Sequence, residues 1–203
     1  QLDYLLHAKS LLMSGSAQVS LLPGAHWFDK FDLQGSAKLI QPQAGAIQLH
    51  IKDNASIKVA ALGAADRPVH INDYGNSLDI GGNLTWHGNI NSEKKLEGAG
   101  SSQLYGQIQV KSLHLKGDGK VTLPRGDYYY KELELEGSSK LLFQDEALSQ
   151  LHIKEKTSLA GNSHINSNDK PLIIWGYKDD GIKLSGSSTL YGHLYSSGLL
   201  EME

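Results

Sequence analysis

The chain contains no cysteine, which excludes disulfide frameworks, thiol nucleophiles and thiolate metal sites. Arginine is nearly absent, with only Arg67 and Arg125, and the longest basic run is the pair Lys94-Lys95. With a net charge of −3, the sequence lacks the electrostatic footprint of a nucleic-acid-binding protein. Its apolar runs, such as residues 172–175, are far shorter than the roughly 18 residues that cross a bilayer. We therefore expect no nucleic-acid partner and no transmembrane segment.

The lack of cysteine also bears on the compartment. A cysteine-free chain suits a bacterial exported protein, and the sequence begins with Gln1 rather than Met, as a processed secretory precursor would. We expect an exported bacterial protein of the periplasm, the outer surface or the medium.

What the sequence does contain is an internal duplication. A shift of 102 residues aligns Lys-Ser-Leu at 9–11 with the same letters at 111–113. At the same shift, Gln-Leu-His-Ile-Lys at 48–52 repeats letter for letter at 150–154. The chain is therefore predicted to consist of two related halves.

The duplication has an irregular end. Residues 100–106 match residues 186–192 at a shift of 86 rather than 103, which indicates that the second half lacks 17 residues, close to one repeat unit. We predict a single domain over 1–203 with pseudo-repeat halves at about 9–110 and 111–198.

A shorter period runs inside each half. Apolar-polar-apolar triplets recur every 18 to 21 residues, often followed by Gly-Ser or Gly-Asp; they end at Met13, Leu33, Ile51, Ile71, Leu115, Leu135, Ile153 and Ile174. Alternation with period two is typical of half-buried strands, and helical spacing is nowhere sustained. The five prolines lie between or at the edges of these triplets, and Gly and Ser favour turns there.

Short strands at this period discriminate among repeat folds. Leucine-rich repeats need an Asn or Cys ladder and a convex helical segment, and propeller blades need about 40 residues each. The pattern predicts an all-β fold, a right-handed parallel β-helix (β-solenoid) with coils of about 18–21 residues. Ten or so coils at about 4.8 Å each would form a rod on the order of 50 Å long.

Apolar residues gather at both ends of the chain. They are Leu2, Leu5 and Leu6 at the start and Leu199, Leu200 and Met202 at the end. A solenoid has to protect its terminal sheet edges, so we expect these residues to form caps. Docking of a partner segment, or self-association through the solenoid ends, is the alternative.

Four strings carry a family resemblance. LEGAGSS at 96–102, LHLKGDGKV at 113–121, LELEGSSKL at 133–141 and IKLSGSSTL at 182–190 resemble the coils of GIN-domain auto-transporter adhesin heads. The resemblance implies a β-solenoid in the bacterial cell envelope or secreted from it, with a role in adhesion. It implies no catalytic residue.

Catalytic chemistry on a β-helix needs carboxylates that project from adjacent coils at one height of the rod. The adjacent acidic pairs are Asp179-Asp180 and Asp145-Glu146. We interpret both as solvated turn residues, with calcium binding at Asp179-Asp180 as the minor alternative. We expect no enzyme activity.

The nine histidines do not form a zinc motif. The repeated His50 and His152 each lie between two inward residues, so alternation directs them outward. Their coils would be about five steps, or roughly 25 Å, apart, too far to share an ion. We predict no metal site and no cofactor.

Two aromatic triplets are the candidate binding residues. His26-Trp27-Phe28 follows Pro23-Gly24, and its duplicate Tyr128-Tyr129-Tyr130 follows Arg125-Gly126. Aromatic rings that stand out from a rod can stack on sugars or anchor a protein partner. The candidates are Trp27, Phe28, Tyr128, Tyr129 and Tyr130. The alternative is that alternate members, such as Phe28 and Tyr130, turn inward and fill the core.

Three functional hypotheses follow. The favoured one is a non-enzymatic exported or cell-surface solenoid that binds a glycan or a surface protein through its lateral face, in adhesion or ligand binding. The second is a structural or assembly component of the bacterial envelope. The third is a polysaccharide lyase or hydrolase.

Overall fold

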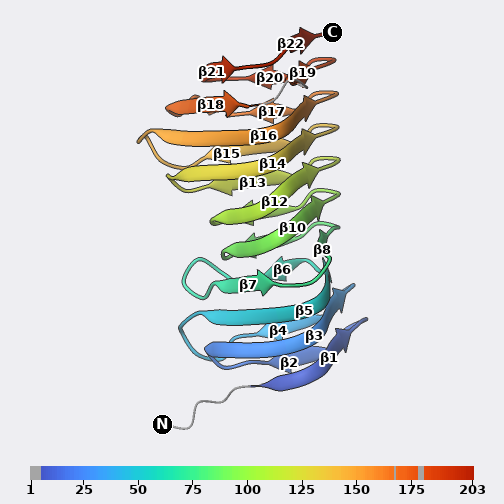
Figure 1. Cartoon of the computed structure of the whole chain (residues 1–203). Helices are drawn as coiled ribbons and strands as arrows, with labels where there is room; N and C mark the ends of the chain where they lie inside the picture. Colours follow the sequence, from blue (N-terminus) through green and yellow to red (C-terminus); the bar gives the residue numbers. More distant parts are fainter. Residues whose placement is uncertain (1–5, 167, 178–180) are drawn as a thin grey trace.

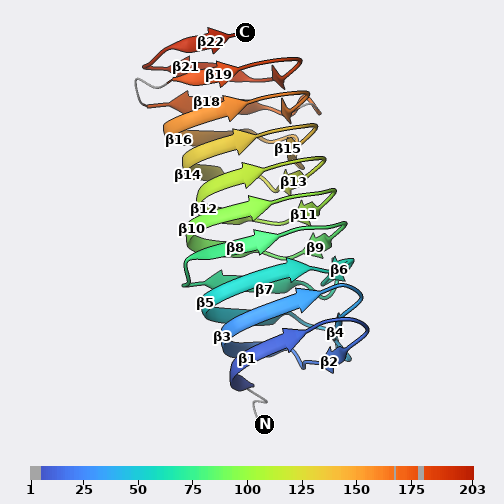
Figure 2. The ribbon, with the colours of Figure 1, turned by 90° about the vertical axis from the view of Figure 1, so that its right-hand side faces the viewer.

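The computed structural model describes residues 6–166, 168–177 and 181–203. These residues form strands and no helix, and the parallel strands stack as a β-solenoid of about ten coils (Figure 1). The coils wind in a right-handed sense in Figures 1 and 2. The predicted all-β parallel β-helix is confirmed.

The strands follow one another as β1 (His7–Met13), β2 (Gln18–Ser20), β3 (Gly24–Gln34), β4 (Lys38–Ile40), β5 (Ile47–Lys58), β6 (Ala61–Leu62), β7 (Val69–Asp73), β8 (Ser77–Ile80), β9 (Thr85–His87), β10 (Ile90–Gly98), β11 (Gln103–Tyr105), β12 (Ile108–Leu115), β13 (Lys120–Leu123), β14 (Asp127–Leu135), β15 (Lys140–Phe143), β16 (Ser149–Leu159), β17 (His164–Ile165), β18 (Leu172–Gly176), β19 (Ile182–Leu184), β20 (Thr189–Leu190), β21 (His193–Ser196) and β22 (Leu200–Met202). We number the coils by their long strands. Coils 1 to 5 carry β1, β3, β5, β7 with β8, and β10. Coils 6 to 10 carry β12, β14, β16, β18 with β19, and β21 with β22.

The long strands form one sheet in the order β1-β3-β5-β7-β10-β12-β14-β16-β18-β21, and the short strands form the opposite side of the rod (Figure 2). Many long strands change register midway, for example between Phe28 and Lys30 and between Tyr130 and Glu132. In coils 4, 9 and 10 the same path is divided into two strands: β7 with β8, β18 with β19, and β21 with β22. We call the residues before this point the first arm, those after it the second arm, and the point itself the bend. The opposite side consists of the two-stranded sheet β2-β4 and the seven-stranded sheet β20-β17-β15-β13-β11-β9-β6, which we together call the back sheet.

Inward side chains stack in ladders between these layers. On the second arm Leu115 lies beside Leu135, which lies beside Leu159, and all three are almost fully buried. Burying such a side chain is worth roughly 1.5–3 kcal/mol. The alternation read from the sequence therefore fills a continuous apolar core along the whole rod.

The turn between the second arm and the back sheet requires glycine in several coils. Gly137 has a φ of 76°, and a Cβ there would lie 2.8 Å from the carbonyl oxygen of Gly117 in the coil below. A side chain would therefore strain the backbone and also clash with the neighbouring turn. Equivalent glycines with positive φ are Gly15, Gly35, Gly82, Gly100, Gly117, Gly161 and Gly186.

These turn glycines correct the predicted end of the duplication. The turn after β8 contains Gly82, and the turn after β19, its counterpart in the second half, contains Gly186. The halves thus correspond coil for coil, and the prediction that 17 residues are missing is wrong. Neighbouring coils have similar sequences because their residues occupy similar environments. The alignment of residues 100–106 with 186–192 was therefore displaced by one coil.

The apolar residues near the ends do not act as buried caps where they are described. Leu6, Leu199, Leu200 and Met202 are all exposed, and Leu200 and Met202 continue the inward ladders of Ile182 and Leu184 on the tenth coil. Leu2 and Leu5 lie outside the described residues. No helix in the described part of the chain is long and apolar enough to cross a bilayer.

Candidate ligand-binding face

One outward position of the first arm carries aromatic, imidazole or amide side chains in coil after coil. In register from coil 1 to coil 6 these are His7, Trp27, His50, Asn72, Asn91 and Gln109, and from coil 7 to coil 10 they are Tyr129, His152, Trp175 and Tyr195. We call this set the first-arm ladder. It contains no carboxylate, lysine or arginine, so its surface is polar without being strongly charged.

The second half of the ladder is a column of stacked rings. The ring centroids of Tyr129 and His152 are 4.5 Å apart, those of His152 and Trp175 6.2 Å, and those of Trp175 and Tyr195 4.6 Å. The interplanar angles lie between 5° and 17°. Tyr177, which follows β18, lies parallel to the His152 ring with its hydroxyl 2.6 Å from His152 Nδ1. Adjacent coils thus hold the rings face to face along the rod.

The first half contains a matching arrangement. Trp27 stacks on His50 with centroids 3.9 Å apart, and the Tyr74 hydroxyl lies 3.1 Å from His50 Nδ1. Trp27 and His50 precede Tyr129 and His152 by 102 residues each, and Tyr74 precedes Tyr177 by 103. Both halves therefore carry an aromatic ring, a histidine and a tyrosine in the same geometry.

The two histidines of these columns favour the neutral form. Burial lowers the pKa of His50, and burial likewise lowers that of His152, where Asp127 acts in the opposite direction. A tyrosine hydroxyl within hydrogen-bond distance of Nδ1 holds each imidazole in place. The columns are therefore uncharged at neutral pH.

Amide side chains cover the surface between the two columns. A shallow depression of about 370 Å³ is lined by Gln48, His70, Ile71, Asn72, Asn89, Ile90, Asn91, Gln107 and Gln109. The Asn89 backbone N–H donates to His70 Nδ1 at 2.9 Å, and the Gln107 backbone N–H donates to Asn89 Oδ1 at 3.0 Å. No described residue bonds to the Asn89 NH₂ group or to His70 Nε2. These donors are available to a ligand with hydroxyl groups.

A second, larger depression lies in the second half, beside the contact between coils 6 and 7. The second arms of β12 and β14 are paired from Ser112 with Glu132 to Leu115 with Leu135, but no pairing joins their first arms. The Tyr130 hydroxyl donates to the Ile108 carbonyl at 2.9 Å across this interval, which we call the seam.

The depression beside the seam has a volume of about 590 Å³, within the roughly 300–1,000 Å³ typical of ligand sites. It is lined by Lys111, Tyr129, Tyr130, Lys131, His152, Lys154, Glu155 and Tyr177. Tyr129 is 68 % exposed, and its ring stacks on His152 alone among the described residues. One face of the Tyr129 ring therefore has no aromatic partner.

The five predicted binding residues divide between the surface and the core. Trp27 and Tyr129 are exposed, whereas Phe28, Tyr128 and Tyr130 are at most 3 % exposed. The alternative that Phe28 and Tyr130 turn inward is confirmed by their burial. Tyr128 points inward with Tyr130 because strand residues two apart share a face. The three buried rings are not on the lateral surface, so the binding prediction is corrected to Trp27 and Tyr129.

Tyr128 has a structural role that the duplication makes visible. Its hydroxyl donates to the Pro124 carbonyl at 2.7 Å, and His26, its counterpart, lies with Nε2 2.8 Å from the Leu22 carbonyl. Both side chains are buried, and each closes the equivalent turn of its own half. Burial also raises the pKa of Tyr128, so its hydroxyl stays protonated and can donate.

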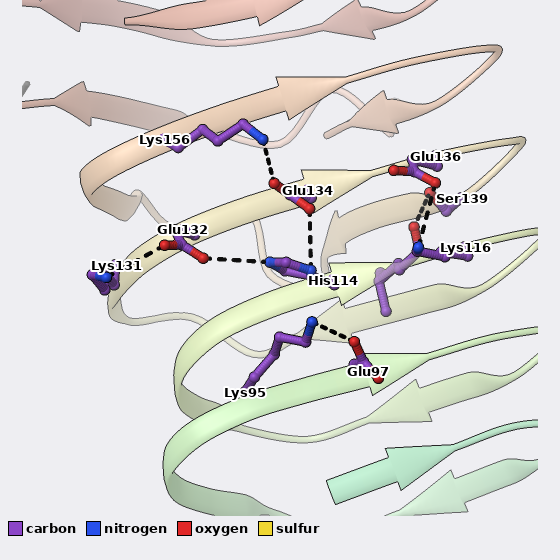
Figure 3. Close-up of polar contacts among 11 residues, drawn as sticks. Lys95, Glu97, His114, Lys116, Lys131, Glu132, Glu134, Glu136, Ser139 and Lys156 are labelled. Carbon is purple, nitrogen blue, oxygen red and sulfur yellow. Dashed lines mark hydrogen bonds and ion pairs between the residues drawn. The ribbon is translucent and has the colours of Figure 1, made fainter. Parts of the chain in front are cut away.

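Sequence reasoning missed a charged cluster on the second arm (Figure 3). Its members Lys95, Glu97, His114, Glu132, Glu134 and Lys156 come from coils 5 to 8. His114 Nδ1 lies 3.1 Å from Glu134 and its Nε2 3.6 Å from Glu132, while Lys156 contacts Glu134 at 2.5 Å. Lys95 forms an ion pair with Glu97.

The carboxylates of the cluster are held in the ionised form. Burial acts to raise the pKa of Glu134, but the hydrogen bond from Lys156 and the neighbouring His114 outweigh it, and the pKa is lowered. The hydrogen bond from Lys95 lowers the pKa of Glu97. A general acid at neutral pH needs the opposite shift. We interpret the cluster as an ion-pair network that links coils.

The predicted acidic pair Asp145-Glu146 is not part of that cluster. Asp145 accepts a hydrogen bond from the Arg125 backbone N–H at 2.7 Å, and Glu146 pairs with Lys170. Asp179-Asp180 lies outside the described residues. In the part of the chain that the structure describes, no three His, Asp or Glu side chains are placed to hold a metal ion.

The fold and this face define a class: a parallel β-solenoid with an aromatic and amide-lined lateral surface. Comparison with protein-family models, curated proteins and solved structures found no match to the chain. The resemblance to GIN-domain adhesin heads therefore stays a prediction.

Proposed function

We propose that this protein is a non-enzymatic β-solenoid that binds carbohydrate through the first-arm ladder. The observation that supports it is the ladder itself, in which two aromatic columns flank a surface of amides in consecutive coils. The C–H face of a sugar ring packs on an aromatic ring, and its hydroxyls exchange hydrogen bonds with amides. The described ladder offers both kinds of contact along one line.

The shape of the ladder favours a chain-like ligand over a globular protein. The contacts form a narrow strip parallel to the rod axis, and they repeat at the coil spacing of about 4.8 Å. A protein interface has a contiguous buried core enriched in large apolar residues. The strip has amides at its middle, Asn72, Asn91 and Gln109, where such a core would lie.

Export and adhesion belong to the same proposal. They are supported by the cysteine-free composition and by the strings that resemble GIN-domain coils. A glycan-binding rod displayed outside the cell would attach the protein to a polysaccharide surface.

The test is substitution of the exposed ladder aromatics. A carbohydrate array first identifies a glycan that binds. We expect Tyr129→Ala and Trp27→Ala each to weaken binding to this glycan about tenfold, because the loss of the ring contacts costs about 1.4 kcal/mol. Isothermal titration calorimetry measures the affinity, and thermal unfolding checks that the rod is intact.

Tyr105→Ala is the matched control. Tyr105 stacks on His87 with centroids 4.8 Å apart, but on the back sheet. Its removal deletes a stacked ring from another side of the rod, and glycan affinity should not change. Equal losses in all three variants, or no glycan bound by the wild type, would contradict the proposal. Concentration-dependent sedimentation in the latter case would favour the envelope-assembly hypothesis.

A further inference from the structure

We propose that the depression beside the seam selects acidic sugars: a uronate unit stacks on Tyr129, and Lys111 and Lys154 bind its carboxylate. The inference rests on the proposed function and specifies the ligand of one part of the ladder. It is drawn from the charges around the depression and from their comparison with the other half of the chain.

Lysines from three consecutive coils line the depression. Lys111, Lys131 and Lys154 all lie at the bend, beside Tyr129. Lys131 is occupied by ion pairs with Glu155 at 3.0 Å and Glu132 at 3.4 Å. Lys111 and Lys154 are exposed, and neither forms an ion pair or a side-chain hydrogen bond with any described residue. Two cations without a described ion pair thus line the same depression as the exposed Tyr129 ring.

The duplication supplies an internal comparison. Residues 102 positions earlier are Lys9, Asp29, Lys52 and Asp53, where the second half has Lys111, Lys131, Lys154 and Glu155. The four side chains sum to zero charge in the first half and to +2 in the second. The halves share the aromatic–histidine–tyrosine geometry but differ in the charge beside it.

A net positive charge beside an aromatic platform indicates an anionic ligand with an apolar face. Like charges on neighbouring coils repel one another, and an anion between them removes that repulsion. Lysine presents a compact cation that binds a single carboxylate without the planar bidentate geometry of arginine. A uronate meets both requirements, because its ring stacks and its carboxylate projects from the ring edge.

The experiment compares three oligosaccharides of equal length by calorimetry: oligogalacturonate, a neutral glucan and a sulfated glycan. We expect the wild type to bind oligogalacturonate about tenfold more tightly than the neutral glucan, with the difference reduced at high salt. The double variant Lys111→Gln/Lys154→Gln should lose about tenfold in affinity for the uronate and none for the neutral glucan. Lys9→Gln/Lys52→Gln, the equivalent change in the first half, is the control and should alter neither.

The outcomes distinguish failure of the acidic-sugar inference from failure of the proposed function. Equal affinity for uronate and neutral glucan, with both lost in Tyr129→Ala, overturns the acidic-sugar inference and retains the proposed function. Binding of the sulfated glycan alone overturns the assignment to a carboxylate. If no oligosaccharide binds, the inference and the proposed function both fail. Loss of uronate affinity in the Lys111/Lys154 variant but not in the control supports the inference.

Discussion

Four histidines make the stability of the rod depend on pH. Burial lowers the pKa of His50, His70, His114 and His152 below the ordinary value of 6.5. The unfolded chain therefore takes up protons at these positions as the pH falls through 6.5, whereas the folded chain takes them up only at lower pH. Stability attributable to these groups is present above pH 6.5 and declines below it.

We expect the Tm of the wild type to fall between about pH 7.5 and 5.5, with a shallower fall in His152→Gln. Differential scanning fluorimetry across this range measures the slope. The carboxylates act in a lower window, because Glu97 and Glu134 have pKa values below 4.5 and lose their contribution only as the pH falls through those values. Parallel curves for the wild type and His152→Gln would contradict the prediction.

The turn glycines make a second residue-scale prediction. Gly137→Ala should destabilise the protein by about 1–3 kcal/mol, because the backbone at φ 76° is strained for alanine and the new Cβ meets the Gly117 carbonyl. Chemical denaturation measures the difference. The control is Gly126→Ala, whose Cβ would meet only Tyr128 side-chain atoms at 3.6 Å or beyond. Similar losses in both variants would show that conformational strain is not the cause.

At the scale of elements, the seam is the place where the stacked strands are incompletely paired. In the first arm, β14 pairs with β16 on one side and lacks ladder partners in β12 on the other. We expect backbone amides of residues 127–130 to exchange faster than those of 149–153, which pair on both sides. Hydrogen exchange followed by mass spectrometry compares the two segments. Equal protection would indicate that the seam is closed in solution.

The sequence predicted the strands better than the surface they build. Alternation located inward residues such as Leu135 and Ile153, because burial on one face leaves a period of two. The bend is not visible in this pattern, since it depends on register shifts between coils. Trp175, Tyr177 and Tyr195 were missed for this reason, as they join Tyr129 and His152 only once that register is known.

At the scale of the whole molecule, the duplication and its shift of 102 residues were predicted, but the correspondence at the end of the halves was not. The strings at 48–52 and 150–154 lie in equivalent strands, β5 and β16. Near the end of each half, similar coils compete as partners in the comparison, and only the three-dimensional stacking distinguishes Gly82 from Gly100 as the counterpart of Gly186. Charged groups were also hard to place from sequence, because His114 and Glu134 meet only through coil stacking.

Five coils separate Trp27 from Tyr129, and this spacing has a consequence for a polymeric ligand. Two binding points about 24 Å apart on a rigid scaffold would make the second contact intramolecular once the first has formed. A glycan long enough to bridge them would then gain avidity, whereas a short oligosaccharide would sample each point separately. The duplication thus makes binding depend on the length of the ligand, in addition to the affinity of either half.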